Sequence, residues 1–202
     1  MTELELTRRE RKKEETKERI AEVALELFRR NGVAATTVEE ICEKADVAKG
    51  TFFNYFPRKE AVFGFLSESW VTEAEEKLAA VLAKGAPAFK KVRDVYVDFA
   101  AFYETDRELS KHMVLEWGRC MHDPADAVCR RWDELGEQVV RQLQAKGELR
   151  ADADPARVSR ILEDIYHGTI VMWLDSPEPP FPLQDELRKR LNLVAQGLAP
   201  RP

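Results

Sequence analysis

Basic, amide and hydroxyl side chains are concentrated between residues 37 and 59. Around residues 49–55 they supply positive charge, hydrogen bonds and apolar contact, and an asparagine such as Asn54 is suited to pair with the edge of an adenine. A capped helix start at Thr37 and the ammonium of Lys59 offer donors or positive potential to phosphates. The pattern favours binding in a DNA major groove. The candidate contact residues are Thr37, Lys49, Gly50, Thr51, Phe53, Asn54, Tyr55 and Lys59.

Patterns for catalysis or metal binding are scarce in this chain. It has no Gly-rich phosphate loop, no HExxH motif, no nucleophile elbow and only three histidines. We therefore predict that it is not an enzyme and uses no cofactor or metal. One alternative stays open, because Cys120, His122 and Cys129 lie on either side of an expected helix start and could form a metal- or redox-responsive site.

The segment that carries the candidate DNA contacts has the pattern of a helix-turn-helix. Thr37 followed by Glu40 is a capping box that starts a short helix, and residues 46–48 leave room only for a tight turn. A second short helix then runs over residues 49–56, where Pro57 stops it. Two short helices joined by so few residues form the helix-turn-helix motif.

This segment resembles the tetracycline-repressor (TetR) family of bacterial transcriptional regulators, over about residues 16–66. The shared features are a capping threonine, apolar residues around the turn, a Lys-Gly-Thr opening of the second helix, aromatic residues and a Lys-Glu pair. They stand here as Thr37, Ile41, Ala45, Val47, Lys49-Gly50-Thr51, Phe53, Tyr55, Phe56 and Lys59-Glu60. The resemblance implies a dimeric DNA-binding regulator, with repression as the usual mode.

Two positions depart from the family pattern. Asp46 stands where the family usually has glycine, so we expect a left-handed aspartate in the turn, a conformation that Asp tolerates better than most residues. Phe53 stands where a phosphate-contacting tyrosine is most often found, and we expect Tyr55 or Asn54 to supply the missing contact.

Apolar residues recur at helical spacing along the rest of the chain, and no alternating β-branched stretch competes. We predict an all-α fold with an N-terminal three-helix helix-turn-helix DNA-binding domain at 1–60 and a C-terminal helical ligand-binding and dimerisation domain at 61–202. The first domain is nearly neutral and the second is acidic. Outside the helix-turn-helix, the expected helices cover 7–31, 58–84, 87–104, 123–146, 154–174 and 183–198, with a further helix after residue 104. That further helix is expected to be capped by Thr105 with Glu108. Asp123-Pro124 and Asp154-Pro155 mark the starts of the helices over 123–146 and 154–174.

Large aromatic and sulfur-containing side chains are dense in the middle of the second domain, where they fit the lining of an apolar pocket. The candidate ligand-binding residues are Tyr96, Phe99, Tyr103, Met113, Trp117, Trp132 and Tyr166. The ionisable groups that could join them are Asp98, His112, Glu116, Asp164 and His167, and the surplus of acids leaves room for a cationic lipophilic ligand.

The last two expected helices carry the stripes best suited to pair with a second copy of the chain in a four-helix interface, which the resemblance also implies. Gly168 would let the helices approach closely. The candidate dimer-interface residues are Ile161, Ile165, Gly168, Met172, Leu187, Leu191, Val194 and Leu198. A monomer that buries these faces internally is the alternative.

The composition predicts a soluble, cytoplasmic protein. No apolar run approaches the length of a membrane span, the first residues lack the pattern of a signal peptide, and three scattered cysteines suit a reducing compartment. We therefore expect a homodimeric repressor that binds a palindromic operator in double-stranded DNA, is released by a small lipophilic effector and makes no contact with membranes. A helical protein in which the helix-turn-helix serves only packing is the remaining alternative.

Overall fold

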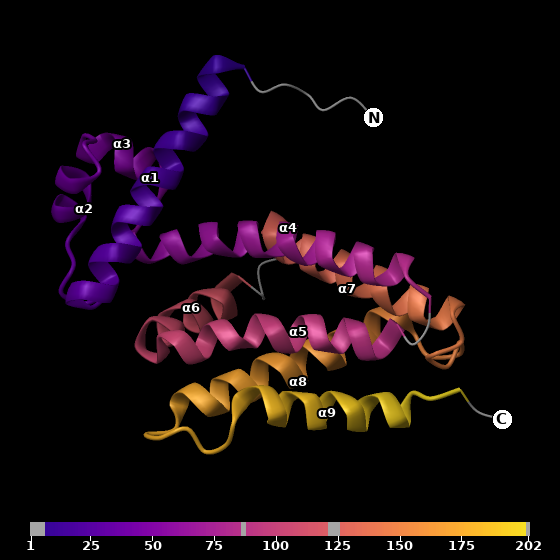
Figure 1. Cartoon of the computed structure of the whole chain (residues 1–202). Helices are drawn as coiled ribbons and strands as arrows, with labels where there is room; N and C mark the ends of the chain where they lie inside the picture. Colours follow the sequence, from indigo (N-terminus) through magenta and orange to yellow (C-terminus); the bar gives the residue numbers. More distant parts are fainter. Residues whose placement is uncertain (1–6, 86–87, 121–125, 201–202) are drawn as a thin grey trace. The chain divides into compact units, whose positions relative to one another are not determined.

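The structure, a computed structural model, describes residues 7–85, 88–120 and 126–200. Within these ranges the regular structure is helical, with no strand, which confirms the predicted all-α class (Figure 1). The elements are α1 (Arg8–Asn31), α2 (Val38–Lys44), α3 (Lys49–Tyr55), a 3-10 turn η1 (Lys59–Ala61), α4 (Val62–Ala83), α5 (Ala88–Thr105), α6 (Arg107–Cys120), α7 (Ala127–Ala145), α8 (Pro155–Asp175) and α9 (Leu183–Gly197).

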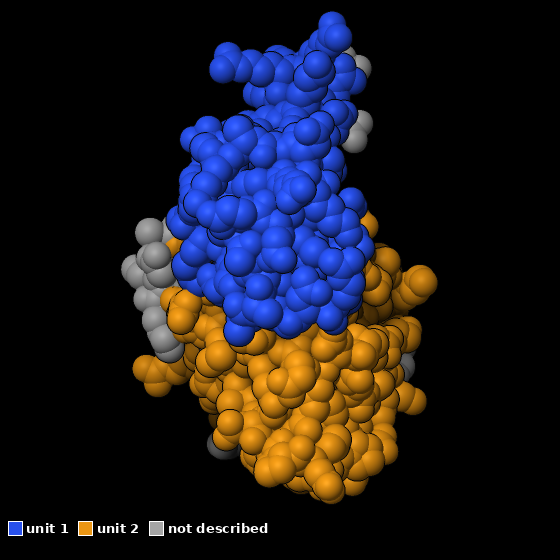
Figure 2. Space-filling model, turned by 90° about the vertical axis from the view of Figure 1, so that its left-hand side faces the viewer, with its two compact units in different colours: residues 1–66 blue, residues 67–202 orange. Residues whose placement is uncertain are grey.

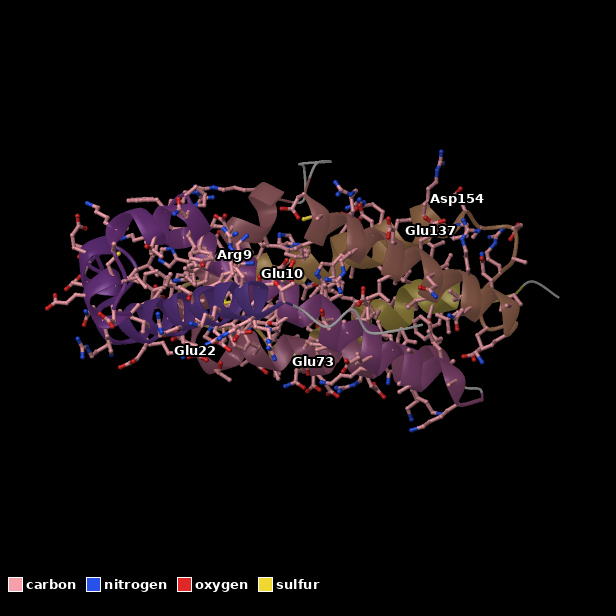
Figure 3. The ribbon with its side chains drawn as sticks, turned by 90° about the horizontal axis from the view of Figure 1, so that it is seen from above. Arg9, Glu10, Glu22, Glu73, Glu137 and Asp154 are labelled. Atoms are coloured by element: carbon pink, nitrogen blue, oxygen red, sulfur yellow. The ribbon has the colours of Figure 1, made fainter. Side chains whose placement is uncertain are left out.

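Local sequence explains where α1 begins and ends. Thr7 and Glu10 form a capping box, in which the hydroxyl of Thr7 accepts from the Glu10 N–H at 3.3 Å and the Glu10 carboxylate accepts from the Thr7 N–H at 2.8 Å. Arg9 and Glu10 are labelled in this first turn in Figure 3. The helix ends at Gly32, whose φ of 83° suits a residue without a side chain.

The turn between α2 and α3 is a Schellman motif built on an aspartate. Asp46 has a φ of 50°, as expected from the sequence, and its N–H donates to the Glu43 carbonyl at 3.3 Å. The Val47 N–H donates to the Cys42 carbonyl at 3.0 Å. Gly147, which follows α7, has a φ of 71° and makes the same pair of bonds with its neighbours, so Asp46 occupies a position that glycine fills elsewhere in the chain.

The chain divides into two compact units, residues 1–66 and 67–202, which Figure 2 colours separately. The division falls six residues beyond the expected end of the first domain, inside α4. Aromatic packing gives the reason, because Phe63 stacks on Phe28 of α1 with ring centroids 5.4 Å apart, and Phe65 lies 6.3 Å from Phe56. The first turn of α4 therefore belongs to the core of the first unit.

The second unit is a bundle in which α8 packs on α7 and α9, and α9 also packs on α5. One core cluster joins α4, α5 and α7 around Leu78, Val139 and Leu143. Another joins α5, α8 and α9, where Ile170 and Leu187 are buried.

Two helices of this unit begin at other residues than the sequence suggested. Asp106 caps α6 by accepting from the Leu109 N–H at 3.0 Å, whereas the hydroxyl of Thr105 donates backward to the carbonyl of Phe102. Asp126 caps α7. The Asp123-Pro124 pair that suggested the start of α7 lies outside the described residues. An aspartate accepts from the first-turn N–H groups as well as threonine does, so sequence alone left the choice of cap ambiguous.

We expect Asp46→Gly to stabilise the first unit by about 0.5–1 kcal/mol, because glycine reaches positive φ without strain. Asp46→Ala should destabilise it, since alanine has neither the freedom of glycine nor the tolerance of aspartate. Urea unfolding followed by circular dichroism measures both. An equal loss of stability in the two variants would mean that the aspartate side chain, and not the backbone geometry, holds the turn.

Candidate nucleic-acid interface and ligand cavity

The two faces of α3 have opposite roles. Phe52 is fully buried and Phe56, which follows the helix, is nearly so, which anchors one face in the core of the first unit. On the other face Lys49 and Asn54 are exposed, and Phe53 leaves 47% of its surface exposed. Because α3 is only two turns long, the residues that close the core decide which side chains remain available. Of the other candidates on this helix, Gly50 is exposed, and Thr51 and Tyr55 are half-buried.

Gly50 has no internal reason to be a glycine. A Cβ built on it meets no atom within 4 Å, and its backbone does not have a positive φ. The missing side chain instead leaves the backbone at the start of α3 open to close approach from outside. Ala48, the residue before the helix, makes no side-chain hydrogen bond to this helix start.

Lys49 forms an ion pair with Glu39 of α2, and the lysine side chain is 56% exposed. Its hydrogen bond holds the pKa of Glu39 below the ordinary value. Exposed ion pairs contribute little stability and are screened by salt. A phosphate could therefore replace the carboxylate as the partner of Lys49.

Thr37 caps α2 and is exposed, as expected. Its backbone N–H donates to the Glu40 carboxylate at 2.7 Å, and this bond is the main reason why the pKa of Glu40 lies below the ordinary value. The backbone N–H and the hydroxyl of Thr37 thus both donate to the chain's own carboxylate. A phosphate at Thr37 would have to compete with Glu40.

The expected phosphate contact at Lys59 needs correction. Its ammonium donates to the carbonyls of Val33 and Thr36, each at 2.6 Å, and to that of Ala34 at 3.3 Å. An ammonium has three donors, so these carbonyls use all of them. Lys59 therefore ties the loop between α1 and α2 to η1, which precedes α4. Sequence reasoning missed this role because the carbonyls belong to backbone some 25 residues away.

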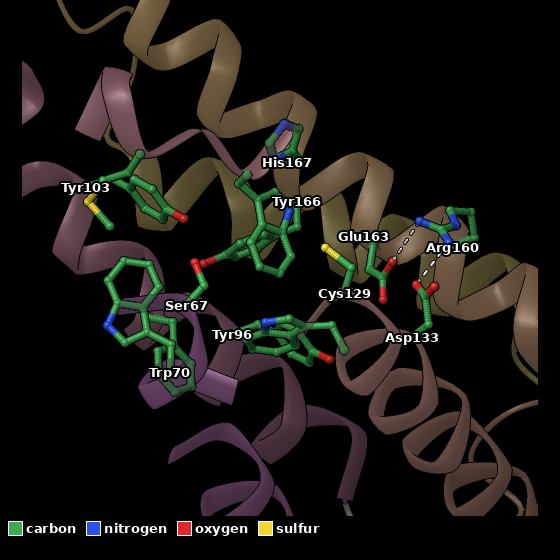
Figure 4. A pocket seen from close by; sticks show the side chains of 14 residues that line it. Ser67, Trp70, Tyr96, Tyr103, Cys129, Asp133, Arg160, Glu163, Tyr166 and His167 are labelled. Carbon is green, nitrogen blue, oxygen red and sulfur yellow. Dashed lines mark hydrogen bonds and ion pairs between the residues drawn. The ribbon is translucent and has the colours of Figure 1, made fainter. Parts of the chain in front are cut away.

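All seven residues expected to bind a ligand line one cavity in the second unit (Figure 4). It holds about 970 Å³, counting open solvent at its mouth. Of the ionisable candidates only His167 lines it, and Asp98, His112, Glu116 and Asp164 do not. The cavity is also lined by residues that no sequence pattern indicated as ligand-binding, namely Ser67, Trp70, Cys129, Asp133, Arg160 and Glu163.

Aromatic rings form most of the cavity wall and meet edge to face. Tyr96 and Tyr166 have centroids 5.9 Å apart, as do Trp117 and Trp132. Burial raises the pKa of Tyr96 and Tyr166 above the ordinary value, so their hydroxyls stay protonated. The indole N–H of Trp132 is buried and, among the described residues, meets no acceptor.

Glu163 brings a carboxyl group into this aromatic wall. Burial, reinforced by the nearby charge of Asp133, raises its pKa to about 7 despite an ion pair with Arg160 at 3.4 Å. Arg160 also bonds Asp133 at 2.9 Å, so one guanidinium serves two acids (Figure 4). A smaller cavity, of about 480 Å³ when open solvent is counted, shares Tyr96, Glu163 and Tyr166 with the first.

The two stripes expected at a dimer interface differ in exposure. On α8, Ile161 and Met172 are nearly half exposed and Gly168 is exposed, whereas Ile165 is half-buried. On α9 the assignment of Leu187 and Leu191 is corrected, because they are 0% and 5% exposed and pack inside their own chain against Trp173 and its neighbours. Val194 and Leu198 are half-buried.

The described residues leave the metal- or redox-site alternative largely untested. His122 lies outside them, and the side chain of Cys120 is not described. Cys129 is buried on α7, forms no disulfide and lines the cavity. Among the described side chains no group of three His, Cys, Asp or Glu could hold a metal ion. None of the described helices is long and apolar enough to cross a lipid bilayer.

Two family models match the chain. Residues 20–64 match a model of bacterial regulatory proteins of the tetR family, and residues 68–197 match the C-terminal domain of TetR/AcrR family transcriptional repressors. The chain belongs to the TetR family. As in that family, it combines a DNA-binding helix-turn-helix with a C-terminal helical domain, and it is a transcriptional regulator.

Individual relatives agree with this assignment. The HTH-type transcriptional regulator AcrR of Shigella flexneri is 26% identical over 91% of this chain and 89% of its own. UidR of Escherichia coli strain K12 is 26% identical over 77% and 80%. Among solved structures, Thermus thermophilus FadR, a TetR-family repressor in complex with lauroyl-CoA, is 30% identical over 92% of this chain and 96% of its own, with a TM-score of 0.74.

The carbonyl contacts of Lys59 predict that Lys59→Met destabilises the first unit by about 2 kcal/mol, because charged hydrogen bonds are lost and carbonyls stay partly buried. DNA affinity should keep its dependence on salt. Lys49→Met is the matched control, with nearly unchanged stability and a salt slope reduced by about one. Urea unfolding and DNA titrations at several salt concentrations compare the two. Lys59 would be a phosphate contact after all if its variant lowered the slope and kept the stability.

Proposed function

We propose that this TetR-family regulator is a homodimeric repressor that binds a palindromic operator and is released when a small lipophilic ligand enters the cavity of the second unit. One observation carries the proposal: the same chain presents an exposed polar face on α3 and encloses a separate aromatic cavity. The first feature suits DNA and the second an effector.

On DNA, we propose that α3 enters the major groove with its start foremost. Asn54 would pair with an adenine edge, and Lys49 would leave Glu39 for a phosphate or a guanine. Gly50 supports this placement, because its open surroundings let the DNA backbone approach the helix. Thr37, Thr51, Phe53 and Tyr55 would complete the contact surface.

For the dimer, we propose that α8 and α9 of two chains form a four-helix interface. The exposed apolar side chains of α8 support it, since Ile161, Val171 and Met172 are each 40–48% exposed. On α9 the exposed Leu193, at 67%, takes the place that the sequence analysis gave to Leu187 and Leu191. Exposed apolar patches mark surfaces where proteins associate.

For release, we propose a shift between two populations of the dimer. Two recognition helices must lie about 34 Å apart to enter successive major grooves. A ligand that prefers another spacing of these helices lowers operator affinity in proportion to that preference. The helix α4 is suited to couple the events, because Phe63 packs in the core of the first unit while Ser67 and Trp70 line the cavity.

A long-chain acyl-CoA is a second candidate effector. It is favoured by the 30% identity to Thermus thermophilus FadR, which binds lauroyl-CoA. The apolar lining would suit the acyl chain, and the free indole N–H of Trp132 would suit an acceptor such as a thioester carbonyl.

Selection of bound fragments from random DNA should recover a palindrome whose half-site centres are about one helical turn apart. Against that site, Asn54→Ala should cost about 1–3 kcal/mol and relax the preference at one base pair of each half-site. Glu22→Gln, on an exposed part of α1, is the control and should bind as the parent does. Recovery of no motif, with weak binding that disappears at moderate salt, would contradict sequence-specific regulation.

The proposed release by a ligand predicts that at least one compound from a panel of lauroyl-CoA and neutral or charged lipophiles releases the protein from its operator. Trp117→Ala should raise the concentration needed for release by about tenfold or more, because it removes cavity wall. Leu115→Ala, on the exposed side of α6, is the control. Fluorescence anisotropy of labelled operator measures release. The cavity would not be the effector site if Trp117→Ala changed neither binding nor release.

A further inference from the structure

We propose that the cavity is built for a lipophilic monocation, with Glu163 as its counter-ion and the aromatic wall as its cage. This inference rests on the proposed effector role and narrows the effector to a chemical class. A quaternary ammonium with an alkyl or aryl tail is the simplest member.

The carboxyl of Glu163 is the first observation. It lines both cavities together with Tyr96 and Tyr166, and its burial there disfavours its charge. Arg160 compensates it only in part, because that guanidinium is nearly half exposed and holds Asp133 at the shorter distance. A ligand that brings a positive charge into the cavity beside this carboxyl would restore the missing compensation.

The aromatic wall is the second observation. Seven of the fourteen lining residues are Trp, Tyr or Phe. Ring faces attract cations, and desolvated quaternary ammonium groups are bound by such cages. The smaller cavity adjoins the same tyrosine pair and is lined by Phe89, Val92 and Leu143, so the surroundings of Glu163 on this side are apolar.

The charge balance of the lining disfavours a polyanion. Asp133 and Glu163 are acids, and the only side chain there with a fixed positive charge, Arg160, is already paired with both. The phosphates of a coenzyme A thioester would find no free guanidinium or ammonium among the described lining residues. A ligand with a single positive charge would instead meet two acids that share one guanidinium.

Binding of such a cation should be linked to the protonation of Glu163. The groups that face it are Asp133 from α7, Ser159, Arg160 and Asp164 from α8, and Tyr96 from α5. The imidazole of His167, also on α8, lines the same cavity. Arg93 of α5 lies on the smaller cavity but is bonded to Asp94 and Asn192, and the α9 residue there is Leu191. From α6 the cavity receives Met113 and Trp117, which carry no charge.

The direction of the pH effect follows from the ionised state of Glu163, which the cation needs. With a pKa of about 7, Glu163 is mostly protonated at pH 6 and mostly ionised at pH 8. A cation binds the ionised form, so its apparent affinity is reduced by the fraction that is protonated. Affinity should therefore rise by about tenfold from pH 6 to pH 8, with release of a proton on binding below pH 7.

The test compares two probes with the same tail, decyltrimethylammonium and the uncharged decyldimethylphosphine oxide, both below their micelle concentrations. Quenching of tryptophan fluorescence measures binding to the full chain without DNA. The ammonium should bind more tightly and show the tenfold rise, whereas the phosphine oxide should bind equally at both pH values. Equal affinities, a flat pH profile for the ammonium, or absence of ammonium binding would overturn the proposal.

Glu163→Gln should weaken ammonium binding at pH 8 by about tenfold or more and abolish its pH dependence, while phosphine oxide binding stays within about twofold. Asp175→Asn is the matched control, because it removes one negative charge from the same helix at an exposed residue that does not line the cavity. It should keep the pH profile. Unchanged phosphine oxide binding shows that Glu163→Gln is folded, and equal effects of the two variants would contradict a specific counter-ion.

Anisotropy of labelled operator separates this inference from the proposed function. Release by the ammonium, lost in Glu163→Gln, supports both. Release by lauroyl-CoA with no preference for the cation would support the proposed ligand-released regulator and overturn the cation inference. Cation binding with the predicted pH profile but without release by any compound would support the cavity's chemistry and overturn the effector role.

Discussion

Burial of aromatic rings is the constraint on which both candidate sites depend. In the first unit the rings pack tightly, with Phe52 and Phe56 closing the core and centroids 5.8 Å apart. Because α3 has only two turns, this burial leaves its other face in water with Lys49 and Asn54. In the second unit rings of similar size meet edge to face around open space, as Tyr96 and Tyr166 do. Aromatic residues thus form both the closed core of the helix-turn-helix unit and the wall of the cavity.

Two ionisable side chains show how differently the fold treats charge. The ammonium of Lys59 meets three carbonyls, which satisfy all its donors and make it a structural tie. The carboxyl of Glu163 shares one guanidinium with another acid and shifts its pKa to about 7. A buried group without full compensation is sensitive to what enters beside it. That difference separates a residue that holds the structure from one suited to sense a ligand.

Helix ends show where prediction from sequence works. The capping boxes at Thr7 and Thr37 are contained within four consecutive residues, so their types alone determine them. The start of α5 is different, because the Glu148 carboxylate accepts the N–H groups of Ala88 and Phe89 at 2.7 and 2.8 Å across 60 residues. Proximity in sequence gives no sign of that contact. The same limit hid the carbonyl partners of Lys59.

Sequence by itself determined the all-α class, the helix-turn-helix, the left-handed Asp46 and the seven aromatic and methionine residues that line the cavity. These depend on periodicity, local hydrogen bonds and side-chain size, which act within a few residues. Tertiary structure alone decided that Glu163 joins that lining and that Leu187 and Leu191 are buried in their own chain. An apolar stripe on a helix looks the same whether it faces its own core or a second copy. Only the packing of α9 on α5 and α8 distinguishes the two.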